Sequence, residues 1–241
     1  MSKNDNTLSF VQGIKDGIPI GLGYLSVSFS FGIMAVSNGI SVISSLLISM
    51  TNLTSAGQVA GIGIIAAGGT ILEMILAQLI INMRYALMSI SLSQKLDGSF
   101  TTPHRLLTSF GITDEIFAVA SGKSGEINRR YMYGLILVPF VCWSMGTLLG
   151  GVAGEVLPER LKAALGIAIY GMFIAIFIPP ARKSVGVLAV VAASAVLSCC
   201  FKYIPVLSSV SGGFVIIICA LAASTLGAVL FPVKEDKEGA E

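Results

Sequence analysis

The sequence predicts an all-α polytopic membrane protein with about seven transmembrane helices, including two broken or re-entrant segments. Hydrophobic residues make up 54% of the 241 positions and charged residues only 12%, and the mean hydropathy is +0.87. A soluble domain is not expected to be this apolar. Stretches long enough to cross a bilayer recur along the chain. Because lipid offers the backbone no hydrogen-bond partner, these stretches are expected to be helical.

The first span is expected at residues 17–36, after a polar N-terminus of mixed charge. That N-terminus lacks the basic, apolar and small-residue order of a cleaved signal peptide, so we expect it to remain on the mature protein. Small residues punctuate the span, and Gly17-x-x-x-Gly21 is typical of a ridge for close helix contact. The alternative is that Pro19 and the glycines loosen the helix near an access path.

An interrupted helix is predicted at residues 42–67. Inside it, residues 51–58 read TNLTSAGQ, and Ser55-x-x-Gln58 is a capping-box pattern that starts a new helix. A half-helix that begins inside the membrane presents free amides and a partial positive charge, which suit a carboxylate. The alternative is one continuous helix whose hydroxyls bond to carbonyls one turn earlier.

The next span, residues 68–93, carries four polar side chains in an apolar run: Glu73, Gln78, Asn82 and Arg84. At about 100° per residue, Glu73 and Arg84 share a helical face. They stand about 16 Å apart along the axis, so each needs another partner. For Glu73, the capping box Thr70-x-x-Glu73 is the favoured interpretation. For Arg84, two interpretations stay open: snorkelling or a structural ion pair, and a role in a polar cavity.

A second interrupted segment is predicted after a polar link. Thr102-Pro103 predicts the start of a short helix. Thr113 then has the position of an N-cap, with Asp114 and Glu115 in the first turn of another helix. These carboxylates either complement the helix dipole at an exposed end or meet Arg84, a proton or an amine. Interrupted spans in both halves of a membrane chain indicate a transporter binding site.

Four further spans are expected at residues 131–152, 163–179, 185–201 and 212–231. In the first of them, Gly146-x-x-x-Gly150-x-x-x-Gly154 forms a long ridge of small residues for close helix contact. Pro179-Pro180 is expected to stop the second. The whole chain, residues 1–241, is expected to form a single membrane domain, with possible halves at 17–93 and 103–232.

The distribution of Lys and Arg among short loops predicts the orientation. If both interrupted segments re-enter on the side they left, the termini and the basic links at 95–105 and 123–130 are cytoplasmic. If both segments cross fully, Lys95 and Arg105 move outside while the termini stay cytoplasmic. The positive-inside rule therefore favours re-entry.

Several function classes lack the residues they need. His104 is the only histidine, so a His-based metal site or a Ser-His-Asp triad is not expected. The four cysteines lie in apolar runs without metal-ligand or disulfide spacing, and no G-x-x-x-x-G-K-[ST] sequence for ATP binding occurs. We therefore expect no enzyme and no resident cofactor, and any transport must use an ion gradient or another subunit.

Three stretches together resemble a known family: GIPIGLGYLSVSFSFGIMA at 17–35, TSAGQVAGIGIIAAGGTILEMILAQLIINMRYALMSISL at 54–92, and GITDEIFAVAS at 111–121. They look like the AzlC-type large subunit of branched-chain amino acid exporters. The resemblance covers most of the chain from about residue 17 onward. The chain departs from many members at Tyr85, where they carry His, and at Tyr24-Leu25-Ser26, where they carry a Pro-Phe-Gly-like run.

This resemblance implies a secondary transporter that exports branched-chain or related apolar amino acids across the bacterial plasma membrane, using the proton gradient. It also implies a small, separately encoded AzlD-type membrane subunit as partner. The candidate substrate-binding residues are Thr54, Ser55, Gly57, Gln58, Asn82, Arg84, Asp114 and Glu115. The alternatives are a membrane subunit without its own translocation path, for which the glycine ridges suffice, and an exporter of a different small solute.

Overall fold

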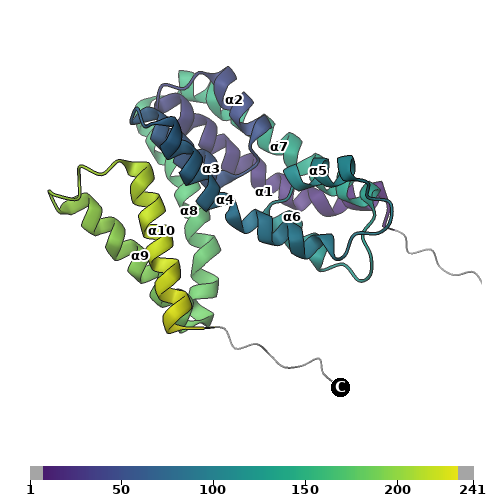
Figure 1. The fold of residues 1–241 in the computed structure, drawn as a ribbon. Helices are drawn as coiled ribbons and strands as arrows, with labels where there is room; N and C mark the ends of the chain where they lie inside the picture. Colours follow the sequence, from purple (N-terminus) through teal and green to yellow (C-terminus); the bar gives the residue numbers. More distant parts are fainter. Residues whose placement is uncertain (1–7, 233–241) are drawn as a thin grey trace, which may run out of the picture. The chain divides into compact units, whose positions relative to one another are not determined.

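The computed structural model describes residues 8–232, and its regular elements in that range are helices (Figure 1). In chain order they are α1 (Phe10–Ser37), α2 (Val42–Thr51), α3 (Ser55–Ala66), α4 (Ile71–Ser93), α5 (Thr102–Phe110), α6 (Asp114–Ser121), α7 (Arg129–Val156), α8 (Glu159–Lys183), α9 (Val185–Tyr203) and α10 (Gly212–Leu230). Among the described helices, α1, α4, α7, α9 and α10 are long and apolar enough to cross a membrane, and α2 and α3 are shorter apolar helices. The predicted all-α polytopic class is confirmed, and the chain is a multi-pass membrane protein.

The first predicted break lies between α2 and α3, at residues 52–54. The predicted capping residue, Ser55, is wrong by one position. Thr54 is the cap, because its hydroxyl accepts a hydrogen bond from the Gly57 amide at 3.3 Å. The Gln58 side chain does not close a capping box with Ser55, since its amide nitrogen donates to the Asn52 carbonyl. The Gln58 side chain of α3 therefore binds the backbone at Asn52, where the break begins.

The second predicted break lies between α5 and α6, at residues 111–113. Thr113 is the N-cap of α6, as predicted, and its hydroxyl accepts a hydrogen bond from the Ile116 amide at 3.4 Å. The start of α5 differs slightly from the prediction, because Thr101 and not Thr102 precedes the helix.

Two other helix limits differ from those predicted. Helix α1 begins at Phe10, because the Ser9 hydroxyl caps it by accepting from the Gln12 amide at 3.1 Å. Helix α8 continues through Pro179 and Pro180 to Lys183, although the sequence predicts a stop there. A proline removes one helical hydrogen bond, and membrane helices tolerate this loss better than soluble ones.

The contacts divide the chain into two compact units. Unit 1 holds the residues up to Ile62 and Ile81–Tyr170, and unit 2 holds Gly63–Ile80 and the residues from Gly171 onward. The division into halves at 17–93 and 103–232 stays a prediction.

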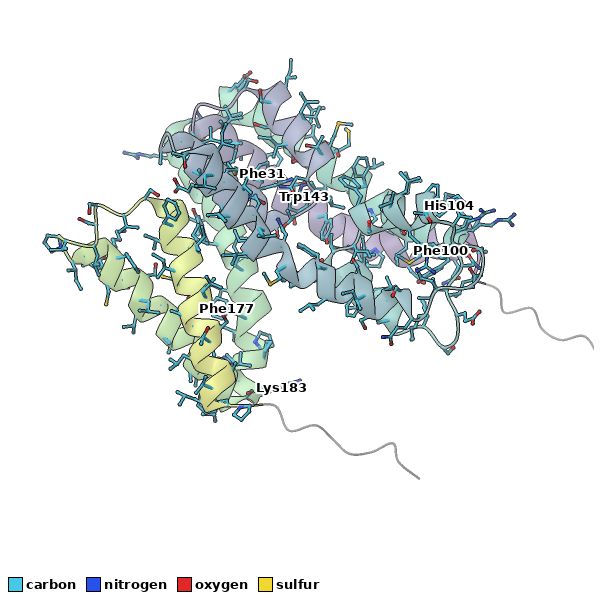
Figure 2. The ribbon with its side chains drawn as sticks, in the orientation of Figure 1. Phe31, Phe100, His104, Trp143, Phe177 and Lys183 are labelled. Atoms are coloured by element: carbon cyan, nitrogen blue, oxygen red, sulfur yellow. The ribbon has the colours of Figure 1, made fainter. Side chains whose placement is uncertain are left out.

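Unit 1 is built on α1 and α7, which lie along one another (Figure 1). Both predicted glycine ridges lie in this contact. A methyl group on Gly17 would come within 2.8 Å of the Leu135 carbonyl, and one on Gly150 would collide with the Phe29 carbonyl. Phe31 and Trp143 are buried in this unit (Figure 2). The small residues thus let two long membrane helices approach at backbone distance.

One end of unit 1 is held by polar contacts between α1, the α4–α5 link and the α6–α7 link. Asp16 of α1 pairs with Lys123 at 2.7 Å and accepts a hydrogen bond from the Tyr131 hydroxyl at 2.8 Å. Lys95 donates to the carbonyls of Ser121 and Lys123 at the end of α6. These contacts surround a buried apolar cluster that includes Ile116, Ile127, Tyr131, Met132 and Leu135.

In unit 2, α9 packs against α10. Close contacts join Gly186 to Phe231 and Gly227 to Val190. A buried apolar cluster of Ile64, Ala77 and Ile217 joins the end of α3 and the start of α4 to α10.

Candidate functional site

An ion pair between Arg84 and Asp114 joins α4 to the second break of unit 1. Arg84 lies on α4 and Asp114 is the first residue of α6, and their closest nitrogen and oxygen atoms are 2.7 Å apart. This is the carboxylate partner that Arg84 needs inside an apolar span. The two side chains stay 44% and 38% exposed. The pair is therefore satisfied, and neither side chain is buried within unit 1.

Tyr85 connects Arg84 to the first break. The Arg84 guanidinium donates to the Tyr85 hydroxyl at 3.1 Å and lies over its ring, 4.9 Å from the centroid. The Tyr85 hydroxyl in turn donates to the Thr54 hydroxyl at 3.4 Å. Thr54 is buried and caps α3. A continuous polar path therefore runs from the start of α3 through Arg84 to the start of α6.

Tyr24 of α1 also contacts the second break. Its hydroxyl contacts the Thr113 hydroxyl at 2.6 Å and the Glu115 carboxylate at short range. Its ring packs edge-on against Trp143, with centroids 5.2 Å apart, in a cluster that also contains Leu53. Tyr24 thus contacts Thr113 at the second break and shares a buried cluster with Leu53 from the first break.

Gln58 has a structural role that explains its burial. It is 1% exposed, and its side-chain oxygen accepts from the Trp143 indole at 3.2 Å. Its amide nitrogen donates to the Asn52 carbonyl, so both ends of the side chain are engaged in holding the break open. A second buried contact nearby joins the hydroxyls of Ser49 and Thr147 at 2.7 Å.

The remaining predicted site residues lie in the same unit. Ser55 is half-buried as the first residue of α3, and Gly57 is buried two positions further on. Asn82 is half-buried on α4, two residues before Arg84.

Three members of this group were missed by the sequence reasoning: Tyr24, Tyr85 and Trp143. An aromatic residue in an apolar span is most simply interpreted as a packing residue. The neighbouring sequence does not show which polar group its hydroxyl or indole will contact. The only signal was that Tyr24 and Tyr85 stand where the chain departs from the family it resembles.

Glu73 is placed apart from this group, in unit 2. It is 3% exposed, and its carboxylate accepts from the Ser211 hydroxyl and the Gly213 amide, both at 2.7 Å. The predicted cap is present as well, because the Thr70 hydroxyl accepts from the Glu73 amide at 3.2 Å and the Thr70 amide interacts with the carboxylate. Glu73 therefore serves the starts of two helices, α4 and α10.

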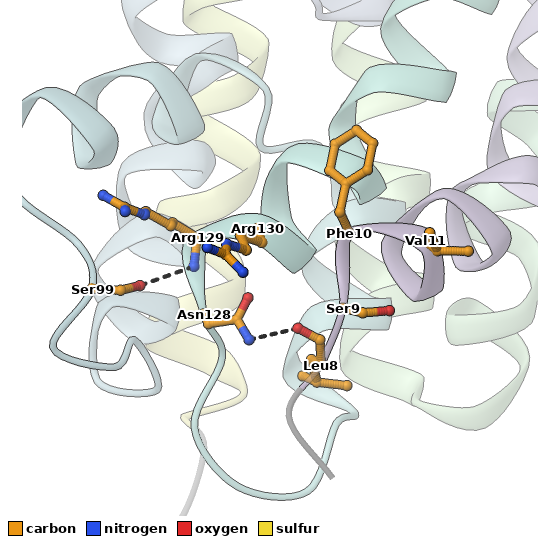
Figure 3. Close-up of a pocket in the computed structure, with 8 residues that line it drawn as sticks. All are labelled: Leu8, Ser9, Phe10, Val11, Ser99, Asn128, Arg129 and Arg130. Atoms are coloured by element: carbon orange, nitrogen blue, oxygen red, sulfur yellow. Dashed lines mark hydrogen bonds between the residues drawn. The ribbon is translucent and has the colours of Figure 1, made fainter. Parts of the chain in front are cut away.

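A pocket of about 530 Å³ lies at the end of unit 1 where α1 and α7 begin (Figure 3). Arg129 and Arg130 line it, beside Asn128, whose side-chain amide donates to the Leu8 carbonyl. None of the predicted site residues lines this pocket. Among the side chains that the structure describes, no cluster of three or more His, Cys, Asp or Glu residues has the arrangement of a metal site.

The group around Arg84 can recognise a small molecule that carries both charges. It offers one guanidinium, one carboxylate and several hydroxyls, next to the first turn of α3. The first amides of a helix have no partner within it, and its dipole favours an anion there. Apolar side chains such as Leu53 and Trp143 border the group.

The chain is similar to known membrane proteins over most of its length. Inner membrane protein YgaZ of Escherichia coli (strain K12) is 30% identical over 172 residues, which cover 68% of this chain and 70% of that protein. An uncharacterized membrane protein of Archaeoglobus fulgidus is 34% identical over 172 residues, covering 70% of this chain and 75% of that protein. The branched-chain amino acid transport protein AzlC of Bacillus subtilis (strain 168) is 24% identical over 164 residues, 67% of this chain and 63% of that protein.

No solved structure matches this chain significantly. The family described as AzlC protein matches residues 19–157. That range is more than half of the chain, and it contains both breaks and every residue of the group around Arg84. The chain therefore belongs to the AzlC family.

Proposed function

We propose that this protein is a secondary transporter that exports branched-chain and other apolar amino acids across the bacterial plasma membrane, driven by the proton gradient. Membership of the AzlC family supports a transport role, since the similar protein of Bacillus subtilis is named a branched-chain amino acid transport protein. The observation that carries the proposal is the Arg84–Asp114 pair at the second break, which is connected through Tyr85 to Thr54 at the first break.

The ion pair matches the charges of an α-amino acid. The substrate carboxylate can replace Asp114 as the partner of Arg84, and the substrate ammonium can replace Arg84 as the partner of Asp114. A zwitterion brings no net charge, so this exchange leaves the charge of the site unchanged. That matters in a membrane, where each uncompensated charge costs about 2.5 kcal/mol or more.

The first turn of α3 gives the carboxylate a second contact. The Gly57 amide is already bound by the Thr54 hydroxyl, so the donors left for a ligand are those of Ser55 and Ala56, which have no acceptor inside the helix. Tyr85 bridges Thr54 and Arg84 and keeps these carboxylate-binding groups near one another.

The apolar surroundings account for the proposed substrate class. Leu53, the Tyr24 ring and Trp143 border the site and form one cluster. Such surfaces separate side chains that differ by one methylene by only about 1–3 kcal/mol. We therefore expect several apolar amino acids to share the path.

We also propose that a small AzlD-type membrane subunit works with this chain and that both termini are cytoplasmic. The partner follows from the family, and the orientation follows from the distribution of Lys and Arg among the loops. Reconstitution with and without the small subunit will show whether flux requires it.

Competition in proteoliposomes tests the function and the carboxylate site together. Export of labelled leucine is expected to be inhibited by valine, isoleucine and methionine, and hardly by the matching amines that lack a carboxylate. Equal competition by the decarboxylated analogues would contradict the carboxylate site. A complete absence of amino-acid flux, even with the small subunit present, would instead favour a subunit without its own path or a different solute.

A further inference from the structure

Two consecutive carboxylates at the start of α6 have different partners. Asp114 pairs with Arg84 at 2.7 Å, whereas Glu115 is contacted by the Tyr24 hydroxyl. Glu115 belongs neither to the Arg84–Asp114 ion pair nor to the Asp16–Lys123 ion pair. Glu115 is half-buried in the first turn of α6, directly after the break. Its negative charge is thus met by a neutral group.

The elements packed around α6 bring few other charges to Glu115. Helix α1 contributes Tyr24, and α4 contributes Arg84 and Tyr85, both of which are engaged by other groups. On α7, residues 134–154 include Cys142 as their only titratable side chain, and its sulfur lies against Gly21. The cations Lys95 and Lys123 are bound at the other end of α6, about 9 Å further along the helix axis.

The contacts of Tyr24 suit both protonation states of Glu115. A hydroxyl has one proton to donate, yet the Tyr24 oxygen touches both Thr113 and Glu115. With Glu115 ionised, Tyr24 donates to the carboxylate and accepts from the Thr113 hydroxyl. With Glu115 protonated, the carboxyl group donates to Tyr24, and Tyr24 donates to Thr113. Rotation of two hydroxyls interconverts these arrangements without moving any heavy atom.

We propose that Glu115 carries the coupling proton of the transport cycle and that Tyr24 is the positioning residue for its carboxylate. The inference rests on the proposed function and names the residue behind its proton coupling. The proton adds to a carboxylate oxygen of Glu115 from the proton-rich side and leaves from it to water on the other side. Arg84, Asp114 and ionised Glu115 together carry one net negative charge, and protonation of Glu115 removes it. We assign this role to Glu115 and not to Asp114, because the Asp114 carboxylate is already engaged by the Arg84 guanidinium at 2.7 Å.

Two flux measurements on the same proteoliposomes separate coupling from binding. Exchange of labelled for unlabelled leucine needs substrate binding and translocation but no gradient, whereas uphill accumulation under an imposed pH gradient needs coupling as well. Glu115→Gln is expected to lower gradient-driven accumulation at least tenfold more than it lowers exchange. Glu126→Gln, which alters an exposed carboxylate in the α6–α7 link, is the matched control and should change neither.

Each outcome of these flux measurements either supports or overturns the role of Glu115. Equal lowering of accumulation and exchange by Glu115→Gln would overturn the inference, because Glu115 would then bind substrate or support the fold. Unchanged accumulation would overturn it as well. Neither result touches the proposed function, which fails only if the wild-type protein exchanges no amino acid, and the inference then fails with it.

Tyr24→Phe tests the positioning role through a pH profile. Phenylalanine keeps the packing against Trp143 and Leu53 but removes the hydroxyl. The ionised carboxylate loses more than the neutral one, because hydrogen bonds to charged groups are the stronger. The midpoint of gradient-driven flux against pH should therefore move to higher pH. An unchanged midpoint would overturn the role of Tyr24.

Discussion

Arg84 is the residue at which sequence reasoning and structure meet most directly. An arginine past the middle of an apolar span needs an anion, and the sequence offered Asp114 and Glu115 as the nearby candidates. The structure pairs it with Asp114. The contacts of Tyr24 and Tyr85 could not be predicted, because their partners Thr113 and Thr54 lie 89 and 31 positions away. The type of a residue shows that it needs a polar partner, but only the fold shows which residue is that partner.

We predict that Arg84→Gln and Asp114→Asn each lower leucine exchange at least tenfold. Each change removes one charge that the zwitterion needs and leaves the opposite charge without its partner. Exchange in proteoliposomes, corrected for the amount of inserted protein, is the measurement. Arg105→Gln, on the exposed face of α5, is the control.

The double variant Arg84→Gln/Asp114→Asn separates a substrate site from a structural ion pair. A structural pair can often be replaced as a unit without harm, so exchange would then return toward the wild-type rate. If both groups bind substrate, the double variant stays at least as inactive as the single ones. Recovery of exchange would therefore return Arg84 to a structural role.

Glu73 offers a second test at the residue scale. Its carboxylate satisfies the Ser211 hydroxyl and the Gly213 amide at the start of α10. Glu73→Ala removes these acceptors and should lower the midpoint of thermal unfolding by several degrees. Gly213→Ala should do the same, because the added methyl group would collide with the Glu73 carboxylate. Glu155→Ala, an exposed position on α7, should leave the midpoint unchanged, and equal effects of all three would contradict this assignment.

At the scale of the helix, capping chemistry predicted both breaks but misplaced two caps by one position each, at the starts of α3 and α5. The hydroxyl-rich run at residues 51–58 contains several possible N-caps, and Thr54 is used instead of Ser55. The choice follows from tertiary contacts, since the Tyr85 hydroxyl also binds Thr54. The continuation of α8 through Pro179 and Pro180 was missed because the rule for soluble helices ends them there.

The glycine ridges allow a prediction about the contact between α1 and α7. Gly150→Ala would drive a methyl group into the Phe29 carbonyl, with backbone on both sides and no flexible side chain to yield. We expect a loss of about 1–3 kcal/mol of stability, seen as a lower midpoint of thermal unfolding in detergent. Gly23→Ala, on α1 with open space around it, is the matched control and should be neutral or slightly stabilising. Equal stability of the two variants would mean that the contact is looser than described.

At the scale of the molecule, composition was enough to predict an all-α membrane protein. Lipid offers no hydrogen-bond partner to irregular backbone, so an apolar span of this kind is expected to be helical. The two compact units were not predicted. Unit 2 depends in part on Glu73 meeting Ser211 and Gly213, which are 138 and 140 positions away. Hydropathy depends only on local composition and carries no information on contacts between distant residues. Sequence patterns could therefore place the membrane spans but could not show which spans pack together in each unit.

The orientation of the two interrupted segments is a prediction for the whole molecule. If both re-enter, the α1–α2 turn and the α4–α5 link lie on opposite sides of the membrane, whereas two full crossings place them on the same side. Ser41 and Gly98 are exposed at these positions, and Gly98 has open space around it. In a background without the four native cysteines, a membrane-impermeant maleimide should label Ser41→Cys from outside and Gly98→Cys only in inverted vesicles. A cysteine in the C-terminal tail, which we propose to be cytoplasmic, serves as the reference. Labelling of both positions from outside would mean that the segments cross, and the basic residues Lys95 and Arg105 would then face the exterior against the positive-inside rule.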